Sequence, residues 1–370
     1  MINENRIINN FIEMVKISSQ SKNERIIGDY LINKLKSLGL EVHEDTAGTV
    51  YNGNCGNIIG ILKGSGTKKL LFSAHMDTVV PCGKITPIIE ETIIKSDGTS
   101  ILGGDDKSGI AAIIEAIETI KENNIEHPEI IVVFSMAEEI GLLGAKVFDI
   151  KKYAPDYCFI LDSSGKPGEV IVQSPTSAKG EMKLIGKPAH AGIEPEKGIN
   201  ALYVASHAIS KMSLGRIDAD TTSNIGIVKG GEAVNIVMPE VSMMYEARSF
   251  SKEKLENLLA ETDRLFKEVA KEHEAEFINN VEIGYNGFKI EKGEPVLKAV
   301  EGAANKLGLV YKEKSSGGGS DANIYSAKGY ISVNLATGMS KVHTTEEFIE
   351  KKDIADSARL VLGIIEEFNK

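Results

Sequence analysis

Cysteine is scarce in this 370-residue chain, and its three positions, Cys55, Cys82 and Cys158, lie far apart. No CxxC pair is present, so the sequence indicates neither a disulfide framework nor a thiolate zinc site. Long apolar runs are also missing: stretches such as 130–134 fall far short of the roughly 20 residues that span a bilayer. The N-terminus lacks the basic start and apolar core of a signal peptide. We therefore expect a soluble, cytoplasmic protein with no membrane partner.

Positive charge is in the minority, with 42 Lys and Arg against 53 Asp and Glu, which gives a net charge of −11. Such a surface repels the phosphates of nucleic acids, so we expect no nucleic acid partner. The apolar fraction of 42% and the charged fraction of 26% are those of an ordinary globular protein. The chain is more than twice the roughly 150 residues of a typical domain, so two domains are expected.

The first part of the chain alternates short apolar runs with amphipathic helical patterns. Two such helices open the sequence; Ser21 and Glu24 have capping-box spacing before the second, and Gly39 is its expected stop. The apolar runs predict strands at 57–62, 70–75, 130–136 and 157–161, and isoleucines at helical spacing predict a helix over 106–121. Apolar strands between helices indicate an α/β domain whose sheet is covered on both faces.

The pattern changes after about residue 175, where strands and helices follow the order βαββαβ. The expected elements are strands at 178–186, 223–229, 240–249 and 276–284 and helices at 198–212 and 251–274. This order is typical of a ferredoxin-like unit. Because the helix and strand alternation then resumes, we expect a discontinuous first domain, 1–175 plus 286–370, with 176–285 inserted into it.

Residue types that bind metals gather where predicted strands end. His75 and Asp77 follow the strand at 70–75 and share one face, because residues two apart in a strand point to the same side. Taken alone, this pair is more typical of an ordinary hydrogen-bonded pair at a strand end than of a metal site. Asp105 and Asp106 precede the isoleucine-rich helix, where one aspartate suffices as an N-cap. The other is then free for another task, such as bridging two cations.

Two adjacent glutamates, Glu138 and Glu139, end the most apolar strand without a positive partner nearby in the sequence. With a metal present, one carboxylate could bind it while the other takes a proton from water. Asp162, at the end of another strand, and His343, in a late loop, would each be uninformative alone. An aspartate there is often a turn former, and a loop histidine needs no ligand.

Together these segments favour a catalytic metal centre. Imidazole and carboxylate ligands without cysteine suit zinc, cobalt or manganese. Two histidines and three carboxylates are enough for two ions that share a bridging carboxylate.

The order of these motifs resembles that of the M20 metallopeptidases. The matching pieces are His75-x-Asp77, Gly-Gly-Asp105-Asp106-Lys-x-Gly, Glu138-Glu139-x-Gly, Asp162 and the late His343. The segments Ala74–Thr78 and Gly317–Asn323 look like the peptidase T-like, tripeptidase branch. This resemblance implies a zinc-exopeptidase-type mixed sheet flanked by helices. It also implies that the ferredoxin-like insertion is a lid and dimerisation domain.

The same resemblance implies a role for each ligand candidate. Asp105 would bridge two zinc ions, with Co²⁺ or Mn²⁺ as alternative metals. His75 and Asp162 would complete the ligands of one ion, and Glu139 and His343 those of the other.

Two further carboxylates match residues that act beside the metals. Glu138 matches the general base, and Asp77 matches the carboxylate that orients the ligand histidine. The resemblance also implies a cis peptide bond after the bridging aspartate.

The substrate-binding residues implied by the resemblance come mostly from the insertion. His190 matches the lid histidine that stabilises the oxyanion, often across a dimer interface. Asn235 and Arg248 match substrate-binding partners, and Arg248 suits a free carboxylate because its guanidinium presents two parallel donors. Ser320 and Asp321, after a glycine-rich loop, are the remaining candidates for substrate contact.

Three functions remain open at this point. The first is a dinuclear zinc exopeptidase, a homodimer that releases the N-terminal residue of short peptides. The second is an M20-type amidohydrolase, deacylase or carboxypeptidase that acts on N-acyl amino acids or dipeptides. The third is a metal-dependent binding protein or inactive homologue, against which the presence of Glu138 argues.

Overall fold

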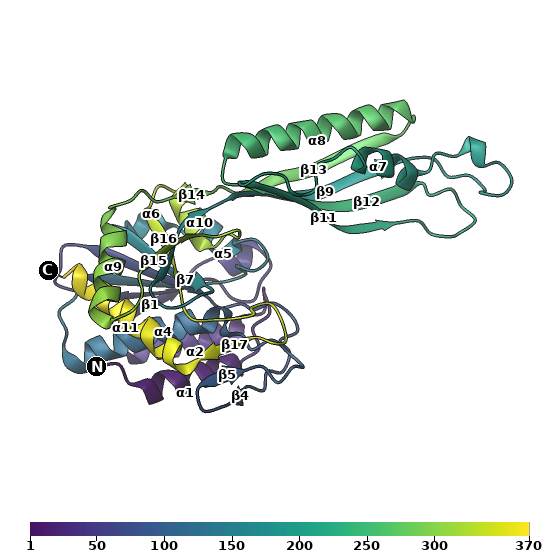
Figure 1. The fold of residues 1–370 in the computed structure, drawn as a ribbon. Coiled ribbons are helices and arrows are strands. Elements are labelled where there is room, and N and C mark those ends of the chain that lie inside the picture. Colours follow the sequence, from purple (N-terminus) through teal and green to yellow (C-terminus); the bar gives the residue numbers. More distant parts are fainter. Residues whose placement is uncertain (370) are drawn as a thin grey trace. The chain divides into compact units, whose positions relative to one another are not determined.

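The computed structural model describes residues 1–369 and divides into two compact units (Figure 1). Unit 1 comprises Met1–Gln173, Lys289–Ser316 and the chain from Ser320 onward. Unit 2 comprises Ser174–Phe288 and Gly317–Gly319. Each unit has its own cluster of buried apolar side chains, as expected for independently packed domains.

Unit 1 is built on a mixed sheet of nine strands. Its order is β1–β2–β6–β3–β7–β16–β8–β14, with β15 beside β8. The strands are β1 (Glu41–Glu44), β2 (Ile58–Leu62), β3 (Lys69–His75), β6 (Glu129–Ser135), β7 (Tyr157–Ser163), β8 (Glu169–Ser174), β14 (Phe288–Lys289), β15 (Lys312–Ser315) and β16 (Ser332–Ala336). Neighbours among β6, β3, β7 and β16 pair in parallel, so their carboxyl ends share one edge of the sheet.

Helices flank this sheet, which confirms the predicted α/β fold class. They are α1 (Glu4–Val15), α2 (Arg25–Ser37), α3 (Ala47–Val50), α4 (Gly104–Asn123), α5 (Leu143–Val147), α6 (Ile150–Tyr153), α9 (Pro295–Leu307), α10 (Asp321–Ala327) and α11 (Lys351–Glu367). The predicted isoleucine stripe of α4 is buried, and this helix packs against α1 and α11 (Figure 1). Among residues 1–369, no helix combines the length and apolar content needed to cross a bilayer.

A partly buried ion-pair network joins α1 to α4. The Nε of Arg6 donates to Oε2 of Glu115 at 2.7 Å, and the Glu115 side chain is fully buried. The same guanidinium pairs with Glu118 and Glu122, and Lys34 of α2 also pairs with Glu118. Ion pairs therefore join the two N-terminal helices to α4, which lies far from them in the sequence.

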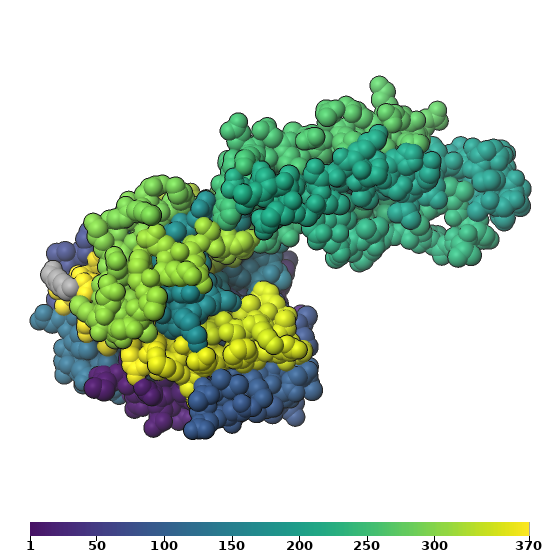
Figure 2. All heavy atoms as spheres, in the orientation of Figure 1, coloured from purple at the N-terminus to yellow at the C-terminus, as the bar shows by residue number. Residues whose placement is uncertain are grey.

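A small three-stranded sheet joins a segment that precedes α4 to a segment near the C-terminus. It contains β4 (Ile88–Ile89), β5 (Ile93–Lys95) and β17 (Phe348–Glu350), in the order β17–β5–β4. β17 pairs antiparallel with β5, so a segment near the C-terminus lies beside one that precedes α4. In Figure 2, the yellow C-terminal segment lies directly against the blue segment that contains β4 and β5.

Unit 2 has the βαββαβ order predicted from the sequence. Its elements are β9 (Thr176–Ile185), η1 (Pro195–Lys197), α7 (Ala201–Ile209), β10 (Gly215–Arg216), β11 (Thr221–Gly230), β12 (Glu240–Ser249), α8 (Lys252–Glu272) and β13 (Glu276–Tyr285). The strand order is β10–β11–β12–β9–β13 with antiparallel pairing throughout. Apart from the short β10, this is the ferredoxin-like arrangement.

The capping box predicted before α2 is wrong. The helix begins after Glu24, and no side chain caps its first turn. The Ser21 hydroxyl instead donates to the Asp77 carboxylate at 2.6 Å. The Glu24 carboxylate accepts backbone N–H groups of Lys22 and Ala137. Ser21 thus binds the distant Asp77, and Glu24 binds both its neighbour Lys22 and the distant Ala137, so neither side chain caps the helix.

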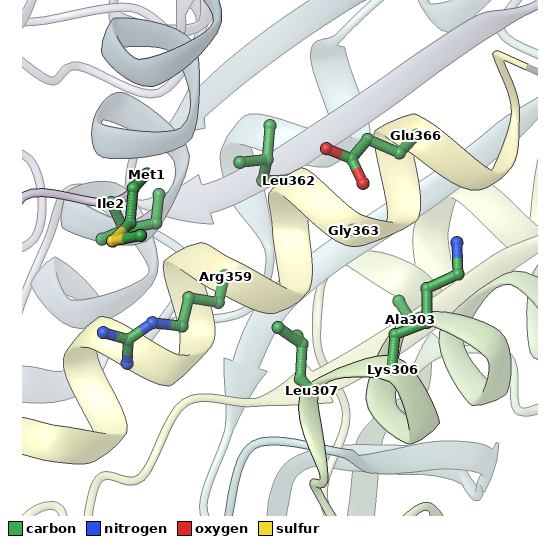
Figure 3. Close-up of a pocket in the computed structure, with 9 residues that line it drawn as sticks. All are labelled: Met1, Ile2, Ala303, Lys306, Leu307, Arg359, Leu362, Gly363 and Glu366. Atoms are coloured by element: carbon green, nitrogen blue, oxygen red, sulfur yellow. The ribbon is translucent and has the colours of Figure 1, made fainter.

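A pocket of about 350 Å³ lies between α9, α11 and the N-terminal residues (Figure 3). Ile2, Leu307 and Leu362 contribute apolar lining, and Arg359 and Glu366 contribute charged groups. None of the predicted site residues lines this pocket.

Candidate metal centre

His75 ends β3 and is almost fully buried. Its ring Nδ1 lies 2.8 Å from the backbone carbonyl oxygen of Asp77 and 3.5 Å from the Asp77 carboxylate. Its Nε2 lies 3.0 Å from Oδ1 of Asp105 and 3.8 Å from Oδ1 of Asp162. The backbone carbonyl of Asp77 is thus the nearer group that orients the ring and leaves Nε2 facing the carboxylates.

The two aspartates at the start of α4 have separate tasks, as the sequence indicated. Asp106 accepts the Gly109 N–H as a helix cap and also accepts the backbone N–H of His75. The Asp105 side chain faces the histidines, with Oδ1 toward His75 and Oδ2 3.1 Å from Nε2 of His343. The Asp105–Asp106 peptide bond is cis, as the family resemblance implied.

Glu138 and Glu139 follow β6, and the Asp77 carboxylate fixes their backbone. Oδ1 of Asp77 accepts the N–H of Glu138 at 2.9 Å, and Oδ2 accepts that of Glu139 at 3.2 Å. Oδ2 also accepts the Ser21 hydroxyl. Asp77 is itself fully buried. Its main contacts therefore hold the strand end that carries both glutamates.

Asp162 lies near the end of β7, beside β16. The amide side chain of Asn334 accepts the Asp162 N–H at 2.9 Å and donates to the Asp162 carbonyl oxygen at 2.6 Å. This two-way contact fixes the backbone at Asp162 and leaves its carboxylate free to face His75.

His343 lies in the loop between β16 and β17 with a positive φ of 62°. Its Nε2 lies 3.0 Å from Oε1 of Glu139 and 3.1 Å from Oδ2 of Asp105. Two backbone hydrogen bonds between Ser340 and Phe348 close the loop. About half of the His343 side chain is exposed, so this side of the cluster is open to solvent.

These five side chains form two overlapping groups, each able to hold a metal ion. One group is His75, Asp105 and Asp162; the other is Asp105, Glu139 and His343. Within each group, one potential ligand atom per residue lies within 4.8 Å of the others. Asp105 belongs to both groups, with one oxygen toward each histidine.

Burial and mutual repulsion dominate the electrostatics of the carboxylates. Burial raises the pKa of Glu138 well above its usual range; His75 opposes this, whereas Asp321 and Glu139 add to it. Burial likewise raises the pKa of Asp162 well above its usual range, and the nearby Glu138 raises it further. Bringing these acids together is costly unless positive charge is supplied.

By contrast, the contacts between the histidines and the shared Asp105 favour the charged forms of these side chains. Hydrogen bonds to Asp105 and Glu139 raise the pKa of His343 to about 10. Burial would raise the pKa of Asp105, but its contacts with His343 and His75 hold it below its usual range. The imidazoles therefore face acceptors that favour positive charge at both sides of Asp105.

The donor set fits divalent cations. It combines imidazole with carboxylate, and the three free cysteines, all buried, belong to neither group. In the ion pairs of residues 1–369, no Lys or Arg pairs with Glu138, Glu139 or Asp162. The protein itself thus provides little positive charge to balance these acids, and metal ions would provide it.

The predicted substrate residues lie in different surroundings. In unit 2, His190 and Asn235 are exposed and adjacent: His190 forms a β-bridge with Ile236, and the Ala191 N–H donates to the Asn235 carbonyl oxygen at 2.9 Å. Arg248 pairs with Glu246 and donates to the Gly317 carbonyl oxygen.

Ser320 and Asp321, in unit 1, are buried. The Ser320 hydroxyl accepts the Ala322 N–H and caps α10. Burial raises the pKa of Asp321 to about 6. Their proposed contacts with substrate stay predictions.

Several residues that support the site were not found from the sequence. Asn334 carries no motif, Glu24 was predicted only as part of a capping box, and Glu347 lies four residues after His343 without a predicted role. A polar side chain that binds a distant backbone group leaves no spacing pattern. The only local signal was the adjacency of Glu347 to a candidate ligand loop.

A family model places the site among known proteins. The model of peptidase family M20/M25/M40 matches residues 71–367. The chain belongs to peptidase family M20. This match spans all five candidate ligands and the whole of unit 2, and it confirms the predicted family and enzyme class.

Similar proteins extend over the full length of the M20 chain. The uncharacterized protein YqjE of Bacillus subtilis is 44% identical over 100% of both chains. The crystal structure of aminopeptidase PepT from Bacillus cereus is 43% identical, covers 100% of both chains and has a TM-score of 0.91. That of a tripeptidase from Staphylococcus aureus is 40% identical, covers 100% of this chain and 99% of the other, and has a TM-score of 0.95.

Proposed function

We propose that this M20 peptidase is a dinuclear zinc-dependent exopeptidase that removes the N-terminal residue of short peptides, tripeptides in particular. The observation that carries the proposal is the pair of ligand groups sharing Asp105, with Glu138 in neither group but within electrostatic range of ligands in both. The full-length similarity to structures described as an aminopeptidase PepT and a tripeptidase supports the substrate class.

His75, Asp105 and Asp162 would hold one ion, and Asp105, Glu139 and His343 the other. When bound, the ions supply Lewis acidity that acidifies water and polarises the scissile carbonyl, with zinc as the preferred metal for this donor set. The Nδ1 contact of His75 with the Asp77 carbonyl oxygen keeps the ring in the orientation that ligation requires.

Glu138 is the general base. Its carboxylate takes a proton from the attacking water as the new C–O bond forms, and it delivers that proton to the amine as the C–N bond breaks. Asp77 supports this role because it holds the backbone N–H of Glu138 at 2.9 Å. Burial and neighbouring acids raise the pKa of Glu138, which suits a group that must both accept and return a proton.

Unit 2 would contribute the substrate contacts. We assign oxyanion stabilisation to His190 and substrate binding to Asn235 and Arg248, whose guanidinium suits a peptide carboxylate. Ser320 and Asp321, at the start of α10, are the remaining candidates for substrate contact.

We also propose a cytoplasmic homodimer formed through unit 2. Strand β11 is paired with the short β10 only at 222–223, and its later part exposes the apolar side chains Ile227 and Val228. Such an open apolar edge favours pairing with a second copy. Light scattering of the purified protein tests the dimer. The cytoplasmic location is supported by the three free cysteines, which suit a reducing compartment.

The decisive experiment is a substrate panel. Metal-free protein is reconstituted with Zn²⁺, Co²⁺ or Mn²⁺ and incubated with free dipeptides, free tripeptides, N-acetylated tripeptides and N-acyl amino acids, with products identified by mass spectrometry. The proposal predicts release of the N-terminal residue from free tripeptides and poor cleavage of blocked ones. Preference for N-acyl substrates would instead establish an amidohydrolase or deacylase, and no metal-dependent hydrolysis of any kind would refute the proposal.

A further inference from the structure

A buried carboxylate outside both ligand groups binds the turn that carries Asp105. The Glu347 side chain is 1% exposed. Its Oε2 accepts the backbone N–H groups of Leu102 and Gly103, both at 2.8 Å. Its Oε1 accepts the N–H of Asp105 at 3.1 Å. Three backbone N–H donors of the turn, among them that of the shared aspartate, are thus bound by one side chain.

The backbone of Glu347 belongs to the loop that carries His343. Its N–H donates to the Thr344 carbonyl oxygen, which folds the loop onto itself. Its carbonyl oxygen accepts the N–H of Ser96, which lies next to β5 in the small sheet. Glu347 therefore connects the His343 loop to the Asp105 turn, although more than 240 residues along the chain separate it from the N–H groups that donate to its side chain.

We propose that Glu347 is a positioning residue for the metal group of Asp105, Glu139 and His343. It fixes Asp105 through its carboxylate and His343 through its place in the loop, so two of the three ligands depend on it. This inference rests on the proposed dinuclear metal site. Side chains that hold metal ligands in place commonly change metal affinity by 10–100-fold when they are replaced.

The other group depends on Glu347 much less. His75 is held by the Asp77 carbonyl oxygen and by Asp106, and the backbone of Asp162 is held by Asn334. In that group, loss of the Glu347 carboxylate would disturb only the shared Asp105. Loss of the Glu347 carboxylate should therefore weaken one of the two metal-binding steps more than the other.

The test variant is Glu347→Gln, with Glu346→Gln as the matched control. Glutamine keeps the size of the side chain but turns an NH₂ group toward at least one buried N–H donor. Glu346 is the adjacent, largely exposed glutamate, whose carboxylate pairs with Lys341. Metal-free proteins are titrated with Co²⁺ by calorimetry and by visible absorption, and turnover of a tripeptide is measured across Co²⁺ concentrations.

For E347Q we expect one of the two binding steps to lose affinity about tenfold or more, with the other step changed less than about threefold. Turnover should recover toward the wild-type value at saturating Co²⁺, because no reacting group has been removed. E346Q should match the wild type in both measurements. A purely structural role for Glu347 would lower the unfolding temperature of the metal-free protein without changing the metal dependence.

Folded E347Q with both binding steps within twofold of the wild type overturns the inference. If E347Q does not fold without metal, Glu347→Asp is titrated under the same criterion, since it keeps the charge but cannot reach all three donors. Failure of the wild type to bind two Co²⁺ ions would instead refute the proposed function, so the two failures are distinguishable.

Discussion

Exchanging Glu138 for glutamine isolates proton transfer from metal binding. Glu138 belongs to neither ligand group, so E138Q should still bind two Co²⁺ ions with near wild-type affinity. Removing a general base typically costs roughly 10²–10⁴-fold in rate, or about 3–5 kcal/mol of barrier. We expect the upper half of this range, because both oxygens of the neighbouring carboxylate of Asp77 are already occupied by hydrogen bonds.

The assay pairs E138Q with the neighbouring variant Glu139→Gln. Both remove one carboxylate from adjacent residues, but only Glu139 belongs to a ligand group. E139Q should lose affinity for one ion and regain part of its turnover at high Co²⁺, whereas added metal should not rescue E138Q. Tripeptide hydrolysis in E138Q within tenfold of the wild type, or loss of an ion from it, would show that the base has been assigned to the wrong residue.

We also expect E138Q to change the stability of the metal-free protein. The folded state raises the pKa of Glu138, so it holds this proton more tightly than the unfolded chain does. The stability that this group contributes is therefore greatest at low pH and falls as the pH rises. Glutamine removes that fall, so metal-free E138Q should unfold at a higher temperature than the wild type at pH 8 and at a similar temperature at pH 4.

Two further predictions concern residues away from the chemistry. Burial raises the pKa of Glu24 from 4.5 to about 7, so its stabilising effect should be complete below pH 4.5 and lost through pH 7. In urea unfolding of metal-free protein, Glu24→Gln should gain stability over the wild type by about 3 kcal/mol between these limits, and parallel pH profiles would contradict the assignment. Arg6→Met leaves the buried Glu115 without its partner and should cost about 3–5 kcal/mol in the same assay. Arg264→Met, which breaks only the exposed pair with Glu268, should cost no more than about 0.5 kcal/mol, and equal costs for the two would refute the network's role.

The strands and helices were predictable because their signals are local. Apolar runs fixed the positions of β3, β6 and β7, and polar residues just after them marked the candidate site. What periodicity could not provide was the order of strands in the sheet. The adjacency of His75, Glu139 and Asp162 follows from the parallel neighbours β6, β3 and β7, and before the structure only the shared metal-ligand chemistry and the family resemblance indicated it.

The supporting contacts were out of reach for a different reason. Glu24 and Glu347 bind backbone N–H groups, which every residue except proline carries, so their partners have no identifying side chain. Spacing even misled in one case, since Ser21 and Glu24 match a capping box but serve Asp77 and Ala137 instead. Long-range contacts of this kind depend on the finished fold.

The sheet of unit 1 takes its central parallel strands from both ends of the chain, and this sets the order of events during synthesis. β3, β6 and β7 leave the ribosome first, then all of unit 2, and only then β16 with the His343 loop. Until β16 adds to β7, a nascent chain can present one ligand group but not the other. A prematurely terminated product would therefore lack the second metal group. Both metal ions can bind only after the chain has been synthesised past the His343 loop.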